Sequence, residues 1–277
     1  MKLSALSLFW KTLRDLKWQV FCYGMGLALL AALVVAIYPS YRQQLSDFEV
    51  PEALKGLTGS ADYGTPSGFL TAEFVSWVPL VTVIFAIMAG TSALAGEEAN
   101  GTLDLLLSQP VSRLRLVVEK SAGILVATAG ISLIACLGWL MSVPFVDIEI
   151  SLPRLILATL DVAPITLAFA FLAMWAGVAL PDRRVATGAV TAIAVAGFFL
   201  NYLAELVSTL KPVAWLSPFH YYDLNILLDS SGWWRSLVLL IAAALFAIAT
   251  ARSFEAREIG VGSAVRIRQL LPGRLRS

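Results

Sequence analysis

The chain alternates long apolar runs with short polar segments. Six runs approach or exceed the roughly 20 residues that a helix needs to cross a bilayer. We expect spans at residues 18–38, 74–94, 116–143, 155–180, 185–206 and 233–250. The runs are continuous and do not alternate, which favours helices over a β-barrel. The pattern therefore predicts an all-α, polytopic membrane protein with one transmembrane domain over residues 1–277.

The residues before the first span have a different pattern. Leu6, Phe9, Trp10 and Leu13 recur at helical spacing, opposite Lys11, Arg14 and Asp15. This pattern is typical of an amphipathic helix that lies in the membrane interface, so we expect one over residues 1–17. The alternative is a cytoplasmic extension of the first span. The apolar run after Trp18 is too long for a signal peptide and is expected to remain as a span.

Composition and charge support the membrane assignment. Hydrophobic residues make up 58% of the chain and charged residues only 14%, against roughly 25% in soluble domains. The net charge of +1 gives no indication of nucleic-acid binding. With the N-terminus inside, fifteen Lys and Arg residues fall in inner segments and five in outer ones. The positive-inside rule then places both termini, including the basic tail 251–277, in the cytoplasm.

The polar segment between the second and third spans is the most informative part of the chain. It reads GEEANGTLDLLLSQPVSRLRLVVEK, from Gly96 to Lys120. Glu97 and Glu98 mark the end of the second span, and Gly101 breaks that helix. Thr102 is expected to cap a new short helix by accepting a backbone N–H.

The new helix is expected to run from Leu103 to about Ser108, because Pro110 prevents its continuation. Its leucines, Leu103, Leu106 and Leu107, share one face by their i, i+3, i+4 spacing. Ser112 can cap the third span, and Arg115 and Glu119 form an i, i+4 pair. A short capped helix of this kind is a rigid protrusion suited to transmitting force. The alternative is a tight turn that only joins two spans.

This motif carries a family resemblance. The pattern G-E-E-x-x-G-T-L-x-x-L-L-S-x-P-V-S-R resembles the cytoplasmic signature of ABC type-2 transporter permeases, the membrane subunits of type V exporters. The matching positions are Gly96, Glu97, Glu98, Gly101, Thr102, Leu103, Leu106, Leu107, Ser108, Pro110, Val111, Ser112 and Arg113. A weaker match, Ser217 to Asp223, resembles the outer segment that such permeases place before their last span. The resemblance covers essentially the whole chain.

The resemblance implies a division of labour. In the family, the motif forms a coupling helix that docks on a separate ATPase, which assigns ATPase coupling here to Glu97, Glu98, Gly101, Thr102, Leu103, Leu106, Leu107, Pro110 and Arg113. No G-x-x-x-x-G-K-[ST] phosphate loop occurs in the sequence. We therefore expect this chain not to be an enzyme and to carry no cofactor, with ATP and Mg²⁺ on the partner.

The family also implies the assembly and its location. Two permeases, expected here as a homodimer, pair with two ATP-binding subunits in the cytoplasmic membrane of a prokaryote and export a cargo through the lipid bilayer. The alternative function is a self-standing secondary transporter or channel. That class normally shows internal repeats and ionisable residues near mid-membrane, which this sequence lacks. A membrane-embedded enzyme ranks last because no credible catalytic cluster is present.

By the same resemblance, the second and fifth spans border the translocation pathway. The candidate pathway residues are Trp77, Phe85, Met88, Phe198, Asn201 and Glu205, although such residues also pack ordinary helix bundles. Gly188, Ala192 and Ala196 form a small-residue stripe suited to close helix contact. The stripe fits either a dimer seam or packing within one subunit.

The remaining polar residues have weaker interpretations. Asp161 and Glu205 are expected near the outer interface. Each is interpreted either as part of a gate or substrate contact, or as an ordinary interfacial carboxylate. His220 is the sole histidine, and no metal site is expected around it. The segment 208–232, rich in aromatics and interrupted by prolines, is expected to re-enter the outer leaflet as short broken helices. Cys22 and Cys136 are expected at opposite depths of the membrane, too far apart for a disulfide.

Overall fold

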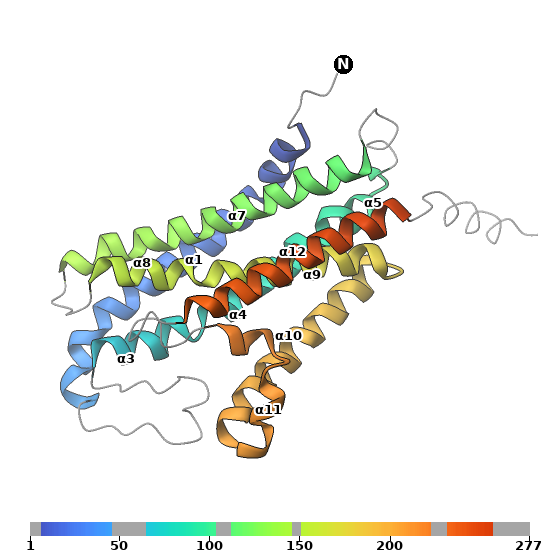
Figure 1. Cartoon of the computed structure of the whole chain (residues 1–277). Coiled ribbons are helices and arrows are strands. Elements are labelled where there is room, and N and C mark those ends of the chain that lie inside the picture. The colour runs from blue at the N-terminus through green and yellow to red at the C-terminus, as the bar shows by residue number, and fades with distance from the viewer. Residues whose placement is uncertain (1–6, 46–64, 104–111, 146–150, 223–231, 257–277) are drawn as a thin grey trace, which may run out of the picture.

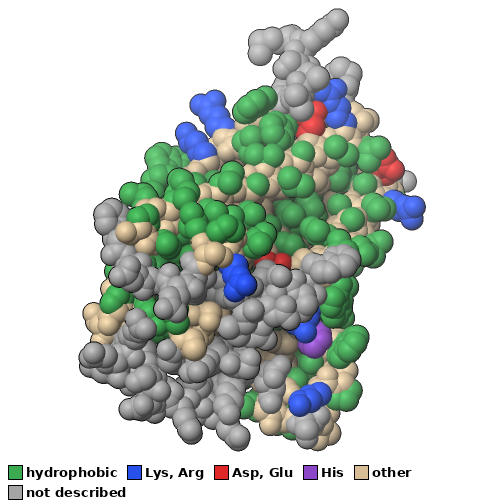
Figure 2. All heavy atoms as spheres, turned by 60° about the vertical axis from the view of Figure 1, so that its left-hand side comes forward, with side chains coloured by type: hydrophobic (Ala, Val, Ile, Leu, Met, Phe, Trp, Pro, Cys, Tyr) green, Lys and Arg blue, Asp and Glu red, His purple; other side chains and the backbone are tan. Residues whose placement is uncertain are grey.

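The computed structural model describes residues 7–45, 65–103, 112–145, 151–222 and 232–256, and these residues form helices joined by short turns (Figure 1). Six helical stretches are long and apolar enough to cross a membrane. They cover Leu8–Ser40, Pro66–Ala99, Arg113–Ser142, Leu152–Ala179, Arg183–Ala204 and Trp234–Ala256. The expected all-α, six-span membrane fold is confirmed, and each expected span overlaps one of these helices. On the face shown in the space-filling view, hydrophobic side chains cover much of the described surface, with charges in isolated places (Figure 2).

The first span is longer than expected. Helix α1 (Ser7–Leu45) runs without a break through the residues expected to form a separate interfacial helix. The described residues thus form a continuous extension of the first span, and the location of residues 7–17 in the membrane interface stays a prediction. Leu8, Thr12 and Leu16 are buried against the bundle, whereas Trp10, on the face that suggested a membrane surface, is 64% exposed.

The second span contains two π-helical turns. It consists of α3 (Pro66–Leu70), η1 (Thr71–Val75), α4 (Val78–Thr91), η2 (Ser92–Gly96) and α5 (Glu97–Ala99). Thr65 caps its start, since its side chain accepts a hydrogen bond from the Gly68 amide. Single-turn π segments inside α-helices are rare and are frequent at functional sites. The η2 turn lies at the charged end of the bundle described below.

The third and fourth spans lie on either side of a turn. Helix α7 (Arg113–Ser142) continues into the short η3 turn (Val143–Phe145). The fourth span is divided into α8 (Leu152–Leu160) and α9 (Val162–Ala179), which meet at Asp161. The division follows from Pro164, whose missing N–H leaves the Leu160 carbonyl without its intrahelical donor.

The fifth and sixth spans are α10 (Arg183–Leu206) and α12 (Trp233–Ala256). Between them lie the short elements η4 (Ser208–Leu210), α11 (Lys211–Ala214) and η5 (Pro218–Tyr221). The expected short broken helices are therefore present. Ser217 fixes this segment to α10, because its buried hydroxyl donates to the Gly197 carbonyl at 2.7 Å.

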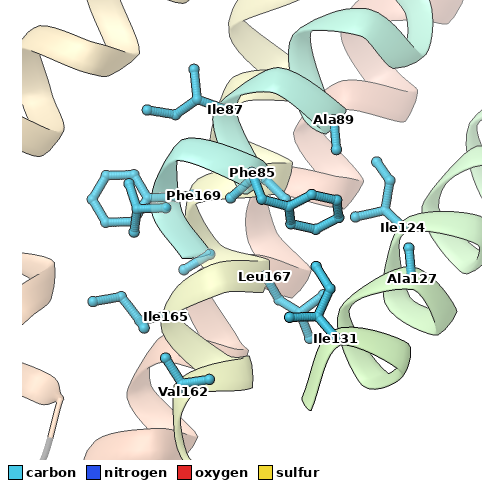
Figure 3. Close-up of a cluster of buried hydrophobic side chains, with 14 of the residues drawn as sticks. Phe85, Ile87, Ala89, Ile124, Ala127, Ile131, Val162, Ile165, Leu167 and Phe169 are labelled. Carbon is cyan, nitrogen blue, oxygen red and sulfur yellow. The ribbon is translucent and has the colours of Figure 1, made fainter. Parts of the chain in front are cut away.

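Helices α4 and α9 form the centre of the bundle. Phe85 of α4 points toward Ile124 and Ile131 of α7 in the buried cluster (Figure 3). Helix α10 leans away from the other helices at its far end (Figure 1), and most of its surface is exposed. The bundle thus has a well-packed centre and one helix with little cover.

Glycines allow the helices to approach closely. A Cβ on Gly90 would lie 2.1 Å from the Ala170 carbonyl oxygen, and a Cβ on Gly138 would lie 2.4 Å from that of Ala28. Membrane helices associate through such small residues because lipid supplies no hydrophobic driving force between them. These contacts hold α4 against α9 and α7 against α1.

Candidate functional site

One end of the bundle, here called the charged end, is built around the Glu97 carboxylate. Lys11 Nζ lies 2.8 Å from its Oε1 and 2.9 Å from its Oε2, and Lys120 Nζ lies 2.7 Å from Oε1. The Thr102 hydroxyl also donates to Oε2. Lys120 is only 3% exposed and Glu97 7%. A buried ammonium group requires such a partner, because an unpaired charge in this environment is very costly.

This ion cluster ties three helices together. Lys11 belongs to α1, Glu97 to α5 and Lys120 to α7. The sequence predicted Glu97 as the end of the second span but missed both lysines as its partners. The available signal was charge balance: Glu97 and the two lysines all lie near span ends on the side predicted to be cytoplasmic.

A second carboxylate at the charged end caps α1. Glu119 Oε2 accepts hydrogen bonds from the backbone amides of Leu8 at 3.1 Å and Phe9 at 3.2 Å. Its Oε1 accepts from Arg115 Nε at 2.7 Å. The expected Arg115–Glu119 pair is confirmed. The capping role was not predicted, and it matters because the first turn of α1 has no acidic residue of its own.

The helix break before the expected coupling helix is present. Gly101 has φ +68°, the left-handed conformation that glycine adopts without strain. The Thr102 amide donates to the Glu97 carbonyl at 2.9 Å, and its hydroxyl donates to the same oxygen at 3.1 Å. The expected cap from Thr102 would bond to residues outside the described ranges. Leu103 is 3% exposed and packs in the core of this chain.

Ser112 and Arg113, which follow this segment, are bonded to α7 and α12. The Ser112 hydroxyl accepts from the Arg115 amide at 3.2 Å, which confirms the expected cap of the third span. Arg113 Nη1 donates to the carbonyls of Phe254 and Glu255, each at 3.1 Å. The carbonyls at the end of α12 thereby gain a cationic partner. Leu106, Leu107 and Pro110 lie outside the described residues.

The pathway candidates do not share one environment. Trp77 is 47% exposed and Met88 42%, both on the second span. Phe85 is fully buried, and its ring packs against α7 (Figure 3) and against Tyr23 of α1. Phe198 and Asn201 on α10 are half-buried. Glu205 lies on α10, and its side chain is outside the described set.

Comparison with known families now adds to the geometry. The family model described as ABC-2 family transporter protein matches residues 6–259, which include the whole charged end. The chain belongs to the ABC-2 transporter family. It is therefore a multi-pass membrane permease of an ABC transporter, a subunit that is normally not itself catalytic and that pairs with an ATP-binding subunit. A search of curated proteins found no match.

Other polar residues of this ABC-2 permease have structural partners. Asp161 accepts a hydrogen bond from the Ser236 hydroxyl and so joins the α8–α9 junction to α12. His220 stacks on Trp215, with ring centroids 5.6 Å apart. Within the part of the chain that the structure describes, no three His, Cys, Asp or Glu residues are placed to hold a metal ion. The two cysteines are free thiols, as expected.

Proposed function

We propose that this ABC-2 permease forms the translocation pathway of an exporter and is driven by a separate ATPase through residues 97–113. The observation that carries the proposal is the anchoring on both sides of residues 104–111. Glu97 on one side is bonded to α1 and α7, and Arg113 on the other is bonded to α12. A displacement of this segment would therefore act on four helices at once.

The anchoring supports a mechanical role for the charged end. Lys120 joins Glu97 across the segment by a buried contact of 2.7 Å. Closure of two ATP-bound partner subunits would push residues 104–111, and the ion cluster would carry the push into α1, α5 and α7 together. In this proposal the charged end faces the cytoplasm of a prokaryotic cell, where both termini also lie.

A second permease copy completes the proposed pathway. Gly188, Ala192 and Ala196 are exposed in the single chain, and no heavy atom lies within 4 Å of a Cβ built on Gly188. Packing within one subunit therefore does not explain this stripe. A homodimer seam along α10 would bury it, and two ATP-binding subunits would then serve the two permeases.

The coupling assignment is tested by replacing the two leucines inside the segment. A double variant that carries Leu106→Asp and Leu107→Asp is expected to lose copurification of the ATPase subunit and ATP-dependent transport. Leu216→Asp is the matched control, because Leu216 is 77% exposed and lies in the outer segment at the opposite end of the bundle. The control should keep both activities.

The result also separates the proposed function from its rival. Retention of the ATPase and of transport by the double variant would show that the segment does not couple the subunits. Transport by the purified chain in vesicles without ATP or a partner would instead identify a secondary transporter or channel. Size-exclusion profiles of the variants check that each remains folded.

A further inference from the structure

A polar pocket of about 380 Å³ opens beside the ion cluster, between α1, η2 and the first residue of α10. Its volume falls within the range of about 300–1,000 Å³ typical of small-molecule sites. The polar side chains that matter for its chemistry are Lys11, Asp15, Gln19, Glu97 and Arg183. Leu16, Ala89 and Ala93 supply an apolar wall.

The pocket has an excess of positive charge on one side. Lys11 and Lys120 share the single carboxylate of Glu97, so these three groups together carry one positive charge. Arg183 adds another, and no carboxylate of the described residues lies within 4 Å of it. Its Nη1 lies 3.8 Å from the position of a Cβ on Gly96, so the guanidinium group reaches across to η2. Arginine binds phosphate oxygens through paired N–H donors.

The α1 side of the pocket offers hydrogen-bond acceptors. Gln19 Oε1 is buried and has no hydrogen-bond partner in the described part of the protein. Asp15 lies one turn earlier on the same face of α1 and also lines the pocket. A buried acceptor without a donor is destabilising. A ligand that places N–H groups against Gln19 and Asp15 would supply the donor that Gln19 Oε1 lacks.

The pocket therefore combines phosphate-binding and ammonium-binding groups beside an apolar wall. We propose that it binds the headgroup of an aminophospholipid, with the phosphate on Arg183 and Lys11 and the primary ammonium on Asp15 and Gln19. Its place at the charged end of the spans, where α10 begins, is where a headgroup would lie while its acyl chains follow the apolar wall. The proposal concerns a lipid site and does not depend on the identity of the exported cargo.

Lipid retention by the full-length protein in detergent tests this proposal, with phosphatidylethanolamine, phosphatidylcholine and phosphatidylglycerol as probes in native mass spectrometry. Phosphatidylethanolamine should bind about tenfold more tightly than phosphatidylcholine, which has the phosphate but no N–H donor. Asp15→Asn should remove this preference. Arg183→Gln should weaken all three lipids about tenfold or more.

Arg184→Gln is the matched control, because Arg184, the neighbour of Arg183, is also exposed but does not line the pocket. It should bind the lipids as the unmodified protein does. Equal binding of phosphatidylethanolamine and phosphatidylcholine, or equal losses from the two arginine variants, would overturn the proposal. Soluble O-phosphoethanolamine should not compete at lipid-like concentrations; if it does, the site takes a water-soluble zwitterion and the lipid assignment is wrong.

Discussion

At the residue scale, the charged end places two lysines of very different burial on one carboxylate. The side chain of Lys120 is 3% exposed and that of Lys11 is 39% exposed. Burial decides the energetic importance of an ion pair, since exposed pairs are screened and buried ones are costly to break. The two lysines therefore allow a buried and a partly exposed ion pair to be compared on the same carboxylate, that of Glu97.

Lys120→Met is expected to destabilise the protein by about 3 kcal/mol, the lower end of the cost of breaking a buried pair, because Glu97 keeps Lys11. Lys11→Met should cost about 1 kcal/mol or less, because Lys11 is partly solvated. Thermal unfolding of the two variants in the same detergent measures the difference. Equal losses would show that burial does not set the strength of these contacts.

The residue-scale predictions from sequence succeeded where partners are close along the chain. The Ser112 cap and the Arg115–Glu119 pair follow from spacings of three and four residues, which helix geometry fixes. The Lys11–Glu97 contact joins residues 86 positions apart. No periodicity encodes such a contact, because it depends on which spans become neighbours.

At the element scale, the apolar runs predicted the six spans because bilayer thickness sets their length. The same runs could not show that the helix of the first span continues through residues 7–17, because an amphipathic stripe suits a separate helix and an extended span equally well. Leu8 and Thr12 are buried on one side of this extension, while Trp10 of the amphipathic stripe is exposed. The π-helical turns in the second span were also missed, since no residue pattern in the run marks them.

The seam between α1 and α7 gives a prediction at this scale. Gly138→Ala should destabilise the protein by about 1–3 kcal/mol, because its Cβ would fall 2.4 Å from the Ala28 carbonyl oxygen and would force the helices apart. Gly26→Ala is the control on α1, where no heavy atom lies within 4 Å of the added Cβ. That change should stabilise the helix by roughly 0.5–1 kcal/mol.

Unfolding midpoints in detergent distinguish the two glycine variants by the direction of their shifts. A neutral Gly138→Ala variant would mean that the seam can widen without loss, and the close contact would then not hold α1 in place.

At the scale of the whole molecule, α10 is the least covered span beside α12. The small-residue stripe lies on its exposed face, with Ile193 about 100° around the helix from Ala192, the middle residue of the stripe. The family membership was predictable from one loop motif, because that motif is specific. The sequence alone could not decide between a dimer seam and packing within one subunit, since small residues suit both kinds of helix contact.

In a variant without Cys22 and Cys136, Gly188→Cys or Ala192→Cys is expected to form a disulfide-linked dimer under mild oxidation. Ile193→Cys should cross-link much less, although it is 46% exposed, because it lies to one side of the stripe, about 100° around the helix from Ala192. Non-reducing gels of membranes give the readout. Equal cross-linking at all three positions would indicate random collision and not a seam.

The cap on α1 has a consequence for biogenesis. The Leu8 amide is satisfied by a carboxylate 111 residues later in the chain. A ribosome therefore delivers the first span to the membrane well before Glu119 has been synthesised. During that interval the first turn of α1 has no acid of its own to hold it. The first described turn of α1 thus reaches its final form only when the third span arrives, so the order of insertion and the order of folding differ.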